Sequence, residues 1–462
     1  MVKKYAAFLF ALATCFSLPS ATWNLKNTRK SNGFKQELTF ATAALLGLSV
    51  AAPSVAEEPG PWKIETAGLV YSESDSRVSA FEPVVSAKKE FGEDRVFNAK
   101  LVLDSLTGAT PTGALSSDNV QTFTRPSGQG SYTIQPDELP IDDTFKDTRV
   151  AFSAGWLQPL TSTLKGGVGV NVSAEHDFRS LGLNGNLSKD FNQRNTTLNL
   201  GLGFESDTIN PEGGVPVAFA EMQPANSTPT RQAEDDDKTV VDTLIGITQV
   251  VNKRTLMQFN YSVSQADGYL TDPYKILSVI DDATGLLVSS TGVNRYTNLY
   301  ENRPDKRTKQ SVYWRTKYRF DRDMFDVSYR YLWDDWDIRS HTIDTRYQWR
   351  FAPNQYLEPH FRYYQQLEAE FYRPALLNSD VTNNTLPEFA SADLRLADFS
   401  AITFGAKYAH RMASGSEWHL RLEWYQQSGE SSPDGLVGAA KDQDVFPTLS
   451  SVIFQAGYAF EW

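Results

Sequence analysis

Alternation of apolar and polar residues is the feature that most constrains how this chain can fold. In residues 197–204 every even position is apolar, and in residues 311–320 the odd positions include Arg315, Lys317 and Arg319. A period of two places the two sets on opposite faces of a β-strand. The same pattern predicts sixteen strands, near residues 62–73, 78–91, 95–104, 147–158, 162–176, 179–191, 195–206, 239–252, 254–265, 310–321, 323–337, 339–351, 355–371, 397–411, 415–428 and 450–462.

The connections between these strands follow a second pattern. Only a few residues follow each even-numbered strand, whereas each of the five long connections follows an odd-numbered strand, at 105–146, 207–238, 266–309, 372–396 and 429–449. In an antiparallel arrangement, all long connections then lie at one end. Short periplasmic turns and long extracellular loops are typical of outer-membrane barrels. The chain is therefore predicted to be an all-β, transmembrane, antiparallel up-and-down β-barrel.

The last predicted strand ends on an aromatic residue. Val452 shares one face of this strand with four aromatic residues, Phe454, Tyr458, Phe460 and Trp462. An exposed apolar edge promotes aggregation in a soluble protein, whereas a closed barrel has no edge. Alternating aromatics with a terminal aromatic resemble the signal read by the barrel assembly machinery, so we predict that the four aromatics form this signal. The alternative is an ordinary edge strand.

Two segments at the N-terminus have the pattern of export signals. The first has two lysines before the apolar run 5–18, and the second has basic residues before 38–55 and ends in Ser54-Val55-Ala56. Small residues at 54 and 56 are typical of a signal-peptidase site. We predict a cleaved leader at 1–56 and one barrel domain at 57–462. In the alternative interpretation, the first run is the signal and the second is a buried helix.

Composition excludes several classes of protein. The only cysteine is Cys15, inside the predicted leader, which excludes a disulfide framework or a cysteine metal site in the mature chain. The formal charge of -12 argues against a nucleic-acid partner. The acidic runs 136–143 and 235–237 lack the spacing of a calcium loop. No metal or cofactor is expected.

If the apolar face of each strand meets lipid, the other face lines the interior, and one part of this interior is charged. The inward-facing bases are predicted to be Arg315, Lys317, Arg319, Arg330, Arg346, Arg350, Arg362, Lys407 and Arg421. Acidic residues are interleaved with them, at Asp326, Asp344, Glu358, Glu368, Glu370 and Glu423. A basic ladder would set the ion selectivity of a pore. The alternative is a salt-bridge lattice that braces the strands, and the interleaved acids favour it.

Another part of the predicted interior is small or uncharged. Strands near 162–206 and 254–265 offer Gly167, Gly169, Asn171, Asn184, Asn186, Asn199, Gly201, Gly203, Gln258 and Asn260. Such a surface leaves room for a loop folded into the barrel, with 105–146 and 266–309 as the candidates. Glycine in strands also permits barrel curvature.

The five histidines do not form a catalytic pattern. His341 has the parity of the lipid-facing residues, and its neighbour Ser340 points to the opposite face, which prevents a nucleophile–base hydrogen bond. His360 and His419 point inward and are expected to join the polar lattice. The sequence contains neither Gly-x-Ser-x-Gly nor His-x-Ser-Asn. We therefore expect no enzymatic activity.

Several segments resemble the bacterial family catalogued as domain of unknown function 3570. They are 72–114, 122–128, 142–150, 180–198, 301–320 and 338–351, and the resemblance extends over 62–462. The resemblance implies an outer-membrane protein of a Gram-negative cell. It implies no mechanism and no catalytic residues.

Together these observations predict a passive, porin-like channel or transporter for small solutes in the Gram-negative outer membrane. The alternative is a closed or loop-plugged barrel that serves as a surface scaffold or binding protein, and an outer-membrane hydrolase is disfavoured. The expected partners are outer-membrane lipid, lipopolysaccharide and, during biogenesis, the barrel assembly machinery.

Overall fold

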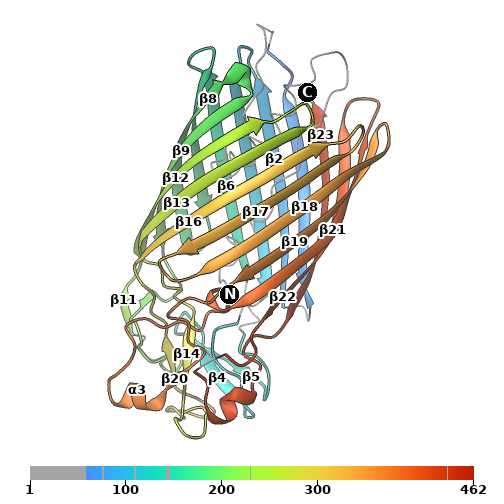
Figure 1. The fold of residues 1–462 in the computed structure, drawn as a ribbon. Helices are drawn as coiled ribbons and strands as arrows, with labels where there is room; N and C mark the ends of the chain where they lie inside the picture. The colour runs from blue at the N-terminus through green and yellow to red at the C-terminus, as the bar shows by residue number, and fades with distance from the viewer. Residues whose placement is uncertain (1–58, 75–76, 109–110, 142–145, 229, 434) are drawn as a thin grey trace.

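Sixteen strands form one closed antiparallel barrel in the computed structural model (Figure 1). The structure describes residues 59–74, 77–108, 111–141, 146–228, 230–433 and 435–462, so the predicted leader lies outside the described residues. Each barrel strand pairs with the next one along the chain, and β1 (Lys63–Glu73) pairs with β23 (Leu449–Glu461). This order confirms the predicted up-and-down antiparallel barrel.

The strand boundaries agree with the periodicity of the sequence. The other barrel strands are β2 (Val78–Glu90), β3 (Val96–Gly108), β6 (Lys146–Pro159), β7 (Leu164–Ala174), β8 (Phe178–Phe191), β9 (Thr196–Ile209), β12 (Asp236–Val250), β13 (Thr255–Gly268), β16 (Lys306–Arg319), β17 (Met324–Asp334), β18 (Arg339–Ala352), β19 (Gln355–Gln366), β21 (Phe399–Arg411) and β22 (Glu417–Gly429). Each predicted strand overlaps one of these. The ends that differ most are the end of β3, the start of β16 and the end of β19.

The first and last strands close the barrel. Their register runs from Lys63 opposite Glu461 to Glu73 opposite Ser451. Beyond it, the backbone groups of Trp62 and Trp462 exchange two hydrogen bonds of 2.8 Å. No backbone edge is then left on either strand, which is what an apolar environment requires.

The barrel carries its large apolar side chains on the outside. Leu198, Leu200, Leu202 and Phe204 of β9 are between 40% and 54% exposed, and the intervening Asn199 faces inward and is buried. The aromatic residues Phe454 and Tyr458 of β23 are also exposed. An apolar exterior around a polar interior is typical of barrels that face lipid. Among the described residues, no helix is long and apolar enough to span a bilayer.

The connections are sorted by length between the two ends of the barrel, as predicted. The connections at the end that holds Trp62 and Trp462 have between two and five residues, and all five long connections lie at the opposite end. Figure 1 shows this opposite end at the bottom of the view. Tight turns at one end and long loops at the other are typical of outer-membrane barrels.

The five long connections fold together into a cap, which we define as their described residues, 111–141, 210–235, 269–305, 367–398 and 430–448, without 229 and 434. Short elements form within it: the hairpin of β4 (Gln121–Thr124) and β5 (Ser131–Ile134), the pair β10 (Val215–Pro216) and β11 (Arg231–Ala233), the sheet of β14 (Ile276–Ile280), β15 (Asn298–Tyr300) and β20 (Leu376–Leu377), the helix α3 (Asn378–Thr382), and the 3-10 turns η3 (Leu394–Leu396) and η4 (Gly438–Asp442). The prediction of a loop folded along the small-residue wall is not met, because the elements of both candidate connections lie beyond the strand ends (Figure 1).

The connection between β13 and β16 is the centre of the cap. Its backbone bonds to each of the other four connections, through Ile276 N to Thr112 O, Phe219 N to Tyr300 O, Ala390 N to Asn302 O and Ala439 N to Thr284 O, at 2.8 to 3.1 Å. The side chains of Ile276, Leu277, Val279 and Ile280 in β14 are fully buried. The cap therefore has an apolar core of its own.

An outward-facing charge tests whether this exterior meets lipid. We expect Leu202→Arg, in the middle of β9, to lower the free energy of unfolding by about 2–4 kcal/mol in phospholipid vesicles, because arginine at the bilayer centre is costly. The measurement is urea unfolding of the vesicle-inserted protein, followed by tryptophan fluorescence.

Val251→Arg is the matched control, because Val251 is 52% exposed and lies in the turn after β12, at the level of the interface. It should change stability little, since the cost of a charge falls toward the interface. Equal and small effects at both positions would contradict a lipid-facing exterior.

Candidate functional site

The inward face of the barrel has two unlike walls. The charged wall is formed by the inward-facing residues of β16, β17, β18, β19, β21 and β22. The amide wall is formed by the inward-facing residues of β7, β8, β9, β12 and β13. Both walls follow from the alternation of the strands, because successive side chains of a strand point to opposite faces. They are the surfaces that a solute inside the barrel would contact.

One cross-strand row carries much of the charged wall. In register, Lys317 of β16 faces Asp326 of β17, which faces Arg346 of β18, which in turn faces His360 of β19. Arg315 donates to the Asp326 carboxylate through Nε at 2.8 Å and also through Nη2, and Lys317 Nζ lies 3.6 Å from the same group. Opposite charges on adjacent strands thus brace this side of the barrel.

The imidazole of His360 links strands that are not neighbours. Its Nε2 lies 2.9 Å from Asp344 Oδ2 on β18, and its Nδ1 lies 2.9 Å from Glu423 Oε1 on β22. The residue of β21 between His360 and Glu423 is Gly405, where a Cβ would lie 2.4 Å from Glu423 Cγ. Glycine therefore leaves the space in which the two side chains meet. A ring that donates to both carboxylates carries a proton on each nitrogen, so the complete bridge needs the imidazolium form.

Four of the predicted bases are ion-paired. Arg315 and Lys317 share Asp326, Arg346 Nε lies 3.5 Å from Asp344, and Arg421 Nη1 lies 3.8 Å from Glu423. These ion pairs have the geometry of a salt-bridge lattice that braces neighbouring strands.

The other predicted bases have different surroundings. Arg330 and Lys407 lie over the rings of Tyr313 and Tyr356, at 5.6 and 5.3 Å from the ring centroids. Arg350 donates to Gln348 Oε1 at 3.2 Å. In register, Arg362 faces Asp344 and Thr403, and Arg319 faces Met324. Among the described residues, Arg350, Arg362 and Lys407 have no carboxylate within ion-pair distance.

Two predicted acidic partners do not lie on the charged wall. β19 ends at Gln366, so Glu368 and Glu370 belong to the connection that follows it. The backbone N–H of Ala369 donates to Leu396 O, which directs this segment into the cap. The apolar–polar alternation continues past the point where strand pairing ends, and this explains the error.

A second group of inward charges, on β3 and β6, escaped the sequence-based prediction. Arg149 Nε donates to Asp104 Oδ2 at 2.5 Å and lies 3.9 Å from Glu175. The signal was present in the alternation, because Leu103 is 40% exposed on the outside and Asp104 beside it must point inward.

Glycine faces asparagine across the amide wall. In register, Asn186 of β8 faces Gly167 of β7, and Asn184 faces Gly169. A Cβ at Gly167 would lie 2.3 Å from Asn186 Oδ1, and one at Gly169 would lie 2.7 Å from Asn184 Oδ1. Each amide therefore lies against the backbone of the neighbouring strand. The result is a flat wall that projects little into the interior.

A buried ion network holds together two of the connections in the cap. Arg303 Nη2 lies 2.7 Å from Asp393, and Arg303 Nε lies 2.5 Å from Glu301. Arg395 Nη2 lies 2.5 Å from Asp272, and its Nε donates to Asp393 at 2.7 Å. The side chains of Glu301 and Asp393 are 0% and 2% exposed. The network joins the β13–β16 connection to the end of the β19–β21 connection.

The pKa values of this network follow from burial and from the paired cations. Burial alone would raise the pKa of Asp393, but the cations of Arg395, Lys275 and Arg303 hold that pKa well below its usual range. Burial raises the pKa of Glu301, with Arg303 opposing the shift. Burial also lowers the pKa of Lys275, whose Nζ donates to Pro111 O at 2.5 Å. Asp393 is therefore the carboxylate that the network keeps ionised.

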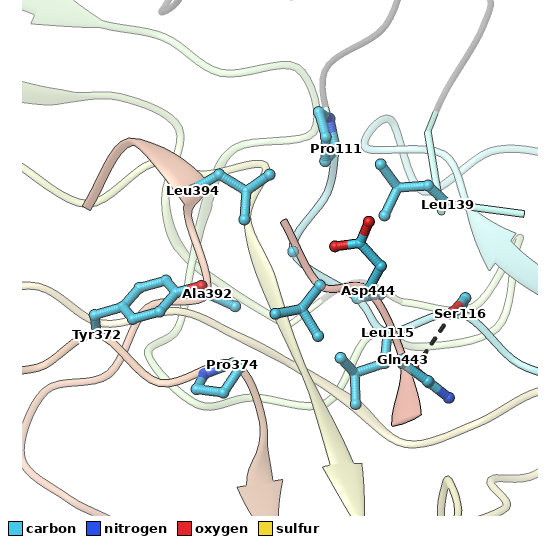
Figure 2. A pocket seen from close by; sticks show the side chains of 13 residues that line it. Pro111, Leu115, Ser116, Leu139, Tyr372, Pro374, Ala392, Leu394, Gln443 and Asp444 are labelled. Atoms are coloured by element: carbon cyan, nitrogen blue, oxygen red, sulfur yellow. Dashed lines mark hydrogen bonds between the residues drawn. The ribbon is translucent and has the colours of Figure 1, made fainter. Parts of the chain in front are cut away.

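A pocket lies in the seam where three connections of the cap meet (Figure 2). Leu115, Leu139, Pro374 and Leu394 give it a mainly apolar lining. Its polar groups include Ser116, Gln443 and Asp444, and Ser116 Oγ donates to Gln443 Oε1 at 3.4 Å. The pocket is lined by residues of the cap alone, so it is separate from both walls of the barrel.

Comparison with protein families gives one match that covers most of the chain. The profile described as "Protein of unknown function (DUF3570)" matches residues 35–460. A search of curated proteins gave no match.

Solved structures give distant likenesses. The "CymD monoaromatic hydrocarbon channel" is 8% identical, with a TM-score of 0.40 and coverage of 92% of both chains. "CdiB from Acinetobacter baumannii" is 7% identical, with a TM-score of 0.43 and coverage of 86% of this chain and 60% of that one. OpdK of Pseudomonas aeruginosa with vanillate is 10% identical, with a TM-score of 0.37 and coverage of 88% and 100%. These likenesses are too distant to transfer a solute or a mechanism.

Removal of one buried carboxylate should loosen the cap without opening the barrel. In Asp393→Asn, Arg303 and Arg395 lose a buried counter-charge, and we expect a loss of about 3–5 kcal/mol in the local stability of the cap. A carboxylate with a depressed pKa contributes stability that is present above its unfolded pKa, near 3.9, and lost as the pH falls through the folded value. The difference between wild type and variant should therefore shrink below about pH 4. Hydrogen–deuterium exchange of 269–305 and of the barrel strands measures both effects.

Asp321→Asn is the matched control. Arg254 Nη2 and Asp321 Oδ1 also lie 2.7 Å apart, but the two side chains are 54% and 85% exposed at a turn of the other end. This substitution should leave exchange unchanged, because exposed pairs contribute little. Faster exchange throughout the barrel in Asp393→Asn would show that the network does not act locally.

Proposed function

The chain belongs to the DUF3570 family, a family of unknown function, and from its geometry we propose that it forms a passive channel for small polar solutes in the outer membrane of a Gram-negative cell. The observation that carries the proposal is a closed barrel of sixteen strands with apolar side chains outside and polar ones inside. Eight strands enclose just enough space for side chains, whereas sixteen to eighteen leave an aqueous channel. A barrel of this size with one flat wall has room for solutes.

The charged wall supports a channel that favours anions. Among the described residues, no carboxylate lies within ion-pair distance of Arg350, Arg362 or Lys407, whereas Glu358 is the acid on this wall without such a pair. The unpaired positive charge exceeds the unpaired negative charge there. Fixed charges on a pore wall set its ion selectivity.

A position in the outer membrane would also give the exterior of the barrel specific partners. The apolar exterior would contact lipid and lipopolysaccharide, and Phe454, Tyr458, Phe460 and Trp462 would serve as the signal for the barrel assembly machinery. The ring centroids of Tyr458 and Phe460 lie 5.5 Å apart in a stacked arrangement, which gives this end of β23 a continuous aromatic surface.

The cap favours a second candidate function, that of a closed barrel that presents a binding surface. Five connections with their own buried core lie over the extracellular end. A cap of this kind either narrows the entrance of a channel or closes it. The two functions differ in whether ions pass through the folded protein.

Single-channel current of the purified protein in a planar bilayer, under a salt gradient, tests the proposal. We expect steady current steps with an anion-biased reversal potential. In Arg362→Gln the bias should become weaker, because one lumen charge is lost, whereas Arg254→Gln at an exposed turn should leave it unchanged.

The other outcomes are equally informative. A cation bias would place control of the current in the acidic cap. No current from protein shown to be folded would reject the open channel. If Asp393→Asn then conducted, the cap would be identified as the closure of a plugged barrel.

A further inference from the structure

The imidazole of His360 is a group on the charged wall whose charge can change near neutral pH. It lies 2.9 Å from Asp344 Oδ2 on one side and 2.9 Å from Glu423 Oε1 on the other. An unperturbed imidazole loses its proton at about pH 6.5. We propose that His360 makes the ion selectivity of the channel depend on pH, with the anion bias strongest in acid. The inference rests on the proposed channel function and assigns part of its selectivity to one residue.

The charged groups around this imidazole come from four strands. They are Asp344 and Arg346 of β18, Glu358 and Arg362 of β19, Lys407 of β21, and Arg421 and Glu423 of β22. Asp344 and Glu423 are hydrogen-bonded to the ring, and the other groups lie beside these three residues. With the imidazolium, the trio of His360, Asp344 and Glu423 carries one net negative charge, and without it the trio carries two.

Loss of the proton also breaks one arm of the bridge. A neutral imidazole has one N–H, so it donates to one carboxylate, and its other nitrogen is an acceptor that cannot bond a second carboxylate. The Glu423 side chain is 3% exposed and packs against Gly405. The Asp344 side chain is 21% exposed and has cations beside it, with Arg346 Nε at 3.5 Å and Arg362 opposite in register. Asp344 can therefore turn away from the ring without losing its counter-charge, and we expect it to be the carboxylate that is released.

Arg362 connects this release with selectivity. It faces Asp344 across the β18–β19 pair, so the Cβ atoms of the two residues lie about 5 Å apart. Among the described residues, no carboxylate lies within ion-pair distance of Arg362 in the bridged state. A released Asp344 would pair with Arg362. Deprotonation of His360 would then lower the positive charge of this wall at two places, and such charges act on a passing ion without contact.

The test is the reversal potential of the purified protein in a phosphatidylcholine bilayer under a potassium chloride gradient. It is measured at about pH 5 and about pH 9, on the two sides of the usual imidazole range. We expect the chloride-to-potassium permeability ratio to be about two-fold lower at the higher pH, which is the effect of one unit charge roughly 10 Å away in water.

Two variants identify the source of this change. In His360→Gln the two-fold change should disappear, and any change caused by Glu358 or Lys407 should remain, because those groups are the same in both proteins. Asp344→Asn keeps the ring but removes the carboxylate that would pair with Arg362. It should keep a stronger anion bias than wild type at about pH 9. Asp344→Asn also provides the test if His360→Gln does not fold, which is checked by heat-modifiable electrophoretic mobility.

His341→Gln is the matched control. His341 lies on β18 but is exposed on the outer face of the barrel, where its Nδ1 lies 2.7 Å from the Tyr329 hydroxyl. Loss of an imidazole there should leave the full pH dependence in place, because the ring is outside the lumen.

Protonation of the ring is measured without reference to current. The ¹⁵N chemical shifts of selectively labelled histidine report it in micelles, and the signal of His360 is the one that His360→Gln lacks. Both ring nitrogens should carry a proton at about pH 5, and one of them at about pH 9.

The outcomes separate this inference from the function on which it rests. No current from folded wild type at either pH would reject the channel, and the inference with it. A conducting channel whose selectivity changes equally with pH in wild type and His360→Gln would overturn the inference alone. So would a His360 ring whose protonation is the same at both pH values.

Discussion

Pairing of every backbone polar group is the constraint on which the rest of this structure depends. A strand that faces hydrocarbon cannot leave its N–H and C=O groups unpaired, because no water is present to satisfy them. All other barrel strands pair with the next strand along the chain, whereas β1 and β23 lie at opposite ends of the sequence. Their pairing satisfies the backbone groups of both strands. Closure then fixes where everything else lies. Trp62, Trp462 and the tight turns lie at one end, and the long connections lie at the other.

Within the closed barrel, glycine shapes both walls, with different results. At Gly405 the missing Cβ lets His360 and Glu423 meet across an intervening strand, so the charged wall becomes more tightly linked. At Gly167 the missing Cβ lets the side chain of Asn186 pack directly against the backbone of β7, so the amide wall becomes flatter. One wall is thus linked by ion pairs across its strands, and the other is formed mainly by amide side chains that lie against glycine. The interior is divided lengthwise into two chemical surfaces.

The barrel was readable from the sequence because its pattern is local. A period of two within each strand, together with the sorting of connection lengths, is enough to define strand number, order and parity, as in 197–204. The charges on β3 and β6 obey the same rule and were open to the same reasoning. The cap was not readable, because its contacts join five separate connections. The run Ile276–Ile280 is apolar except for Ser278 and signals burial, but nothing in it identifies Thr112 or Leu376 as neighbours. Glu368 and Glu370 were misplaced for the same reason, since their position depends on where the cap begins.

The central position of the β13–β16 connection has a consequence for how this surface can diverge. Extracellular loops of a barrel ordinarily change length and sequence independently, each without regard to the next. Here one connection is bonded through its backbone to the other four, so an insertion near Ile276 or Asn302 would disturb several loops at once. Divergence under attack by phage or antibodies should therefore concentrate at tips whose backbone bonds stay within their own connection, such as the turn at 383–385 after α3. We therefore expect sequence changes on the outer face at isolated tips, and few changes at the residues whose backbones bond one connection to another.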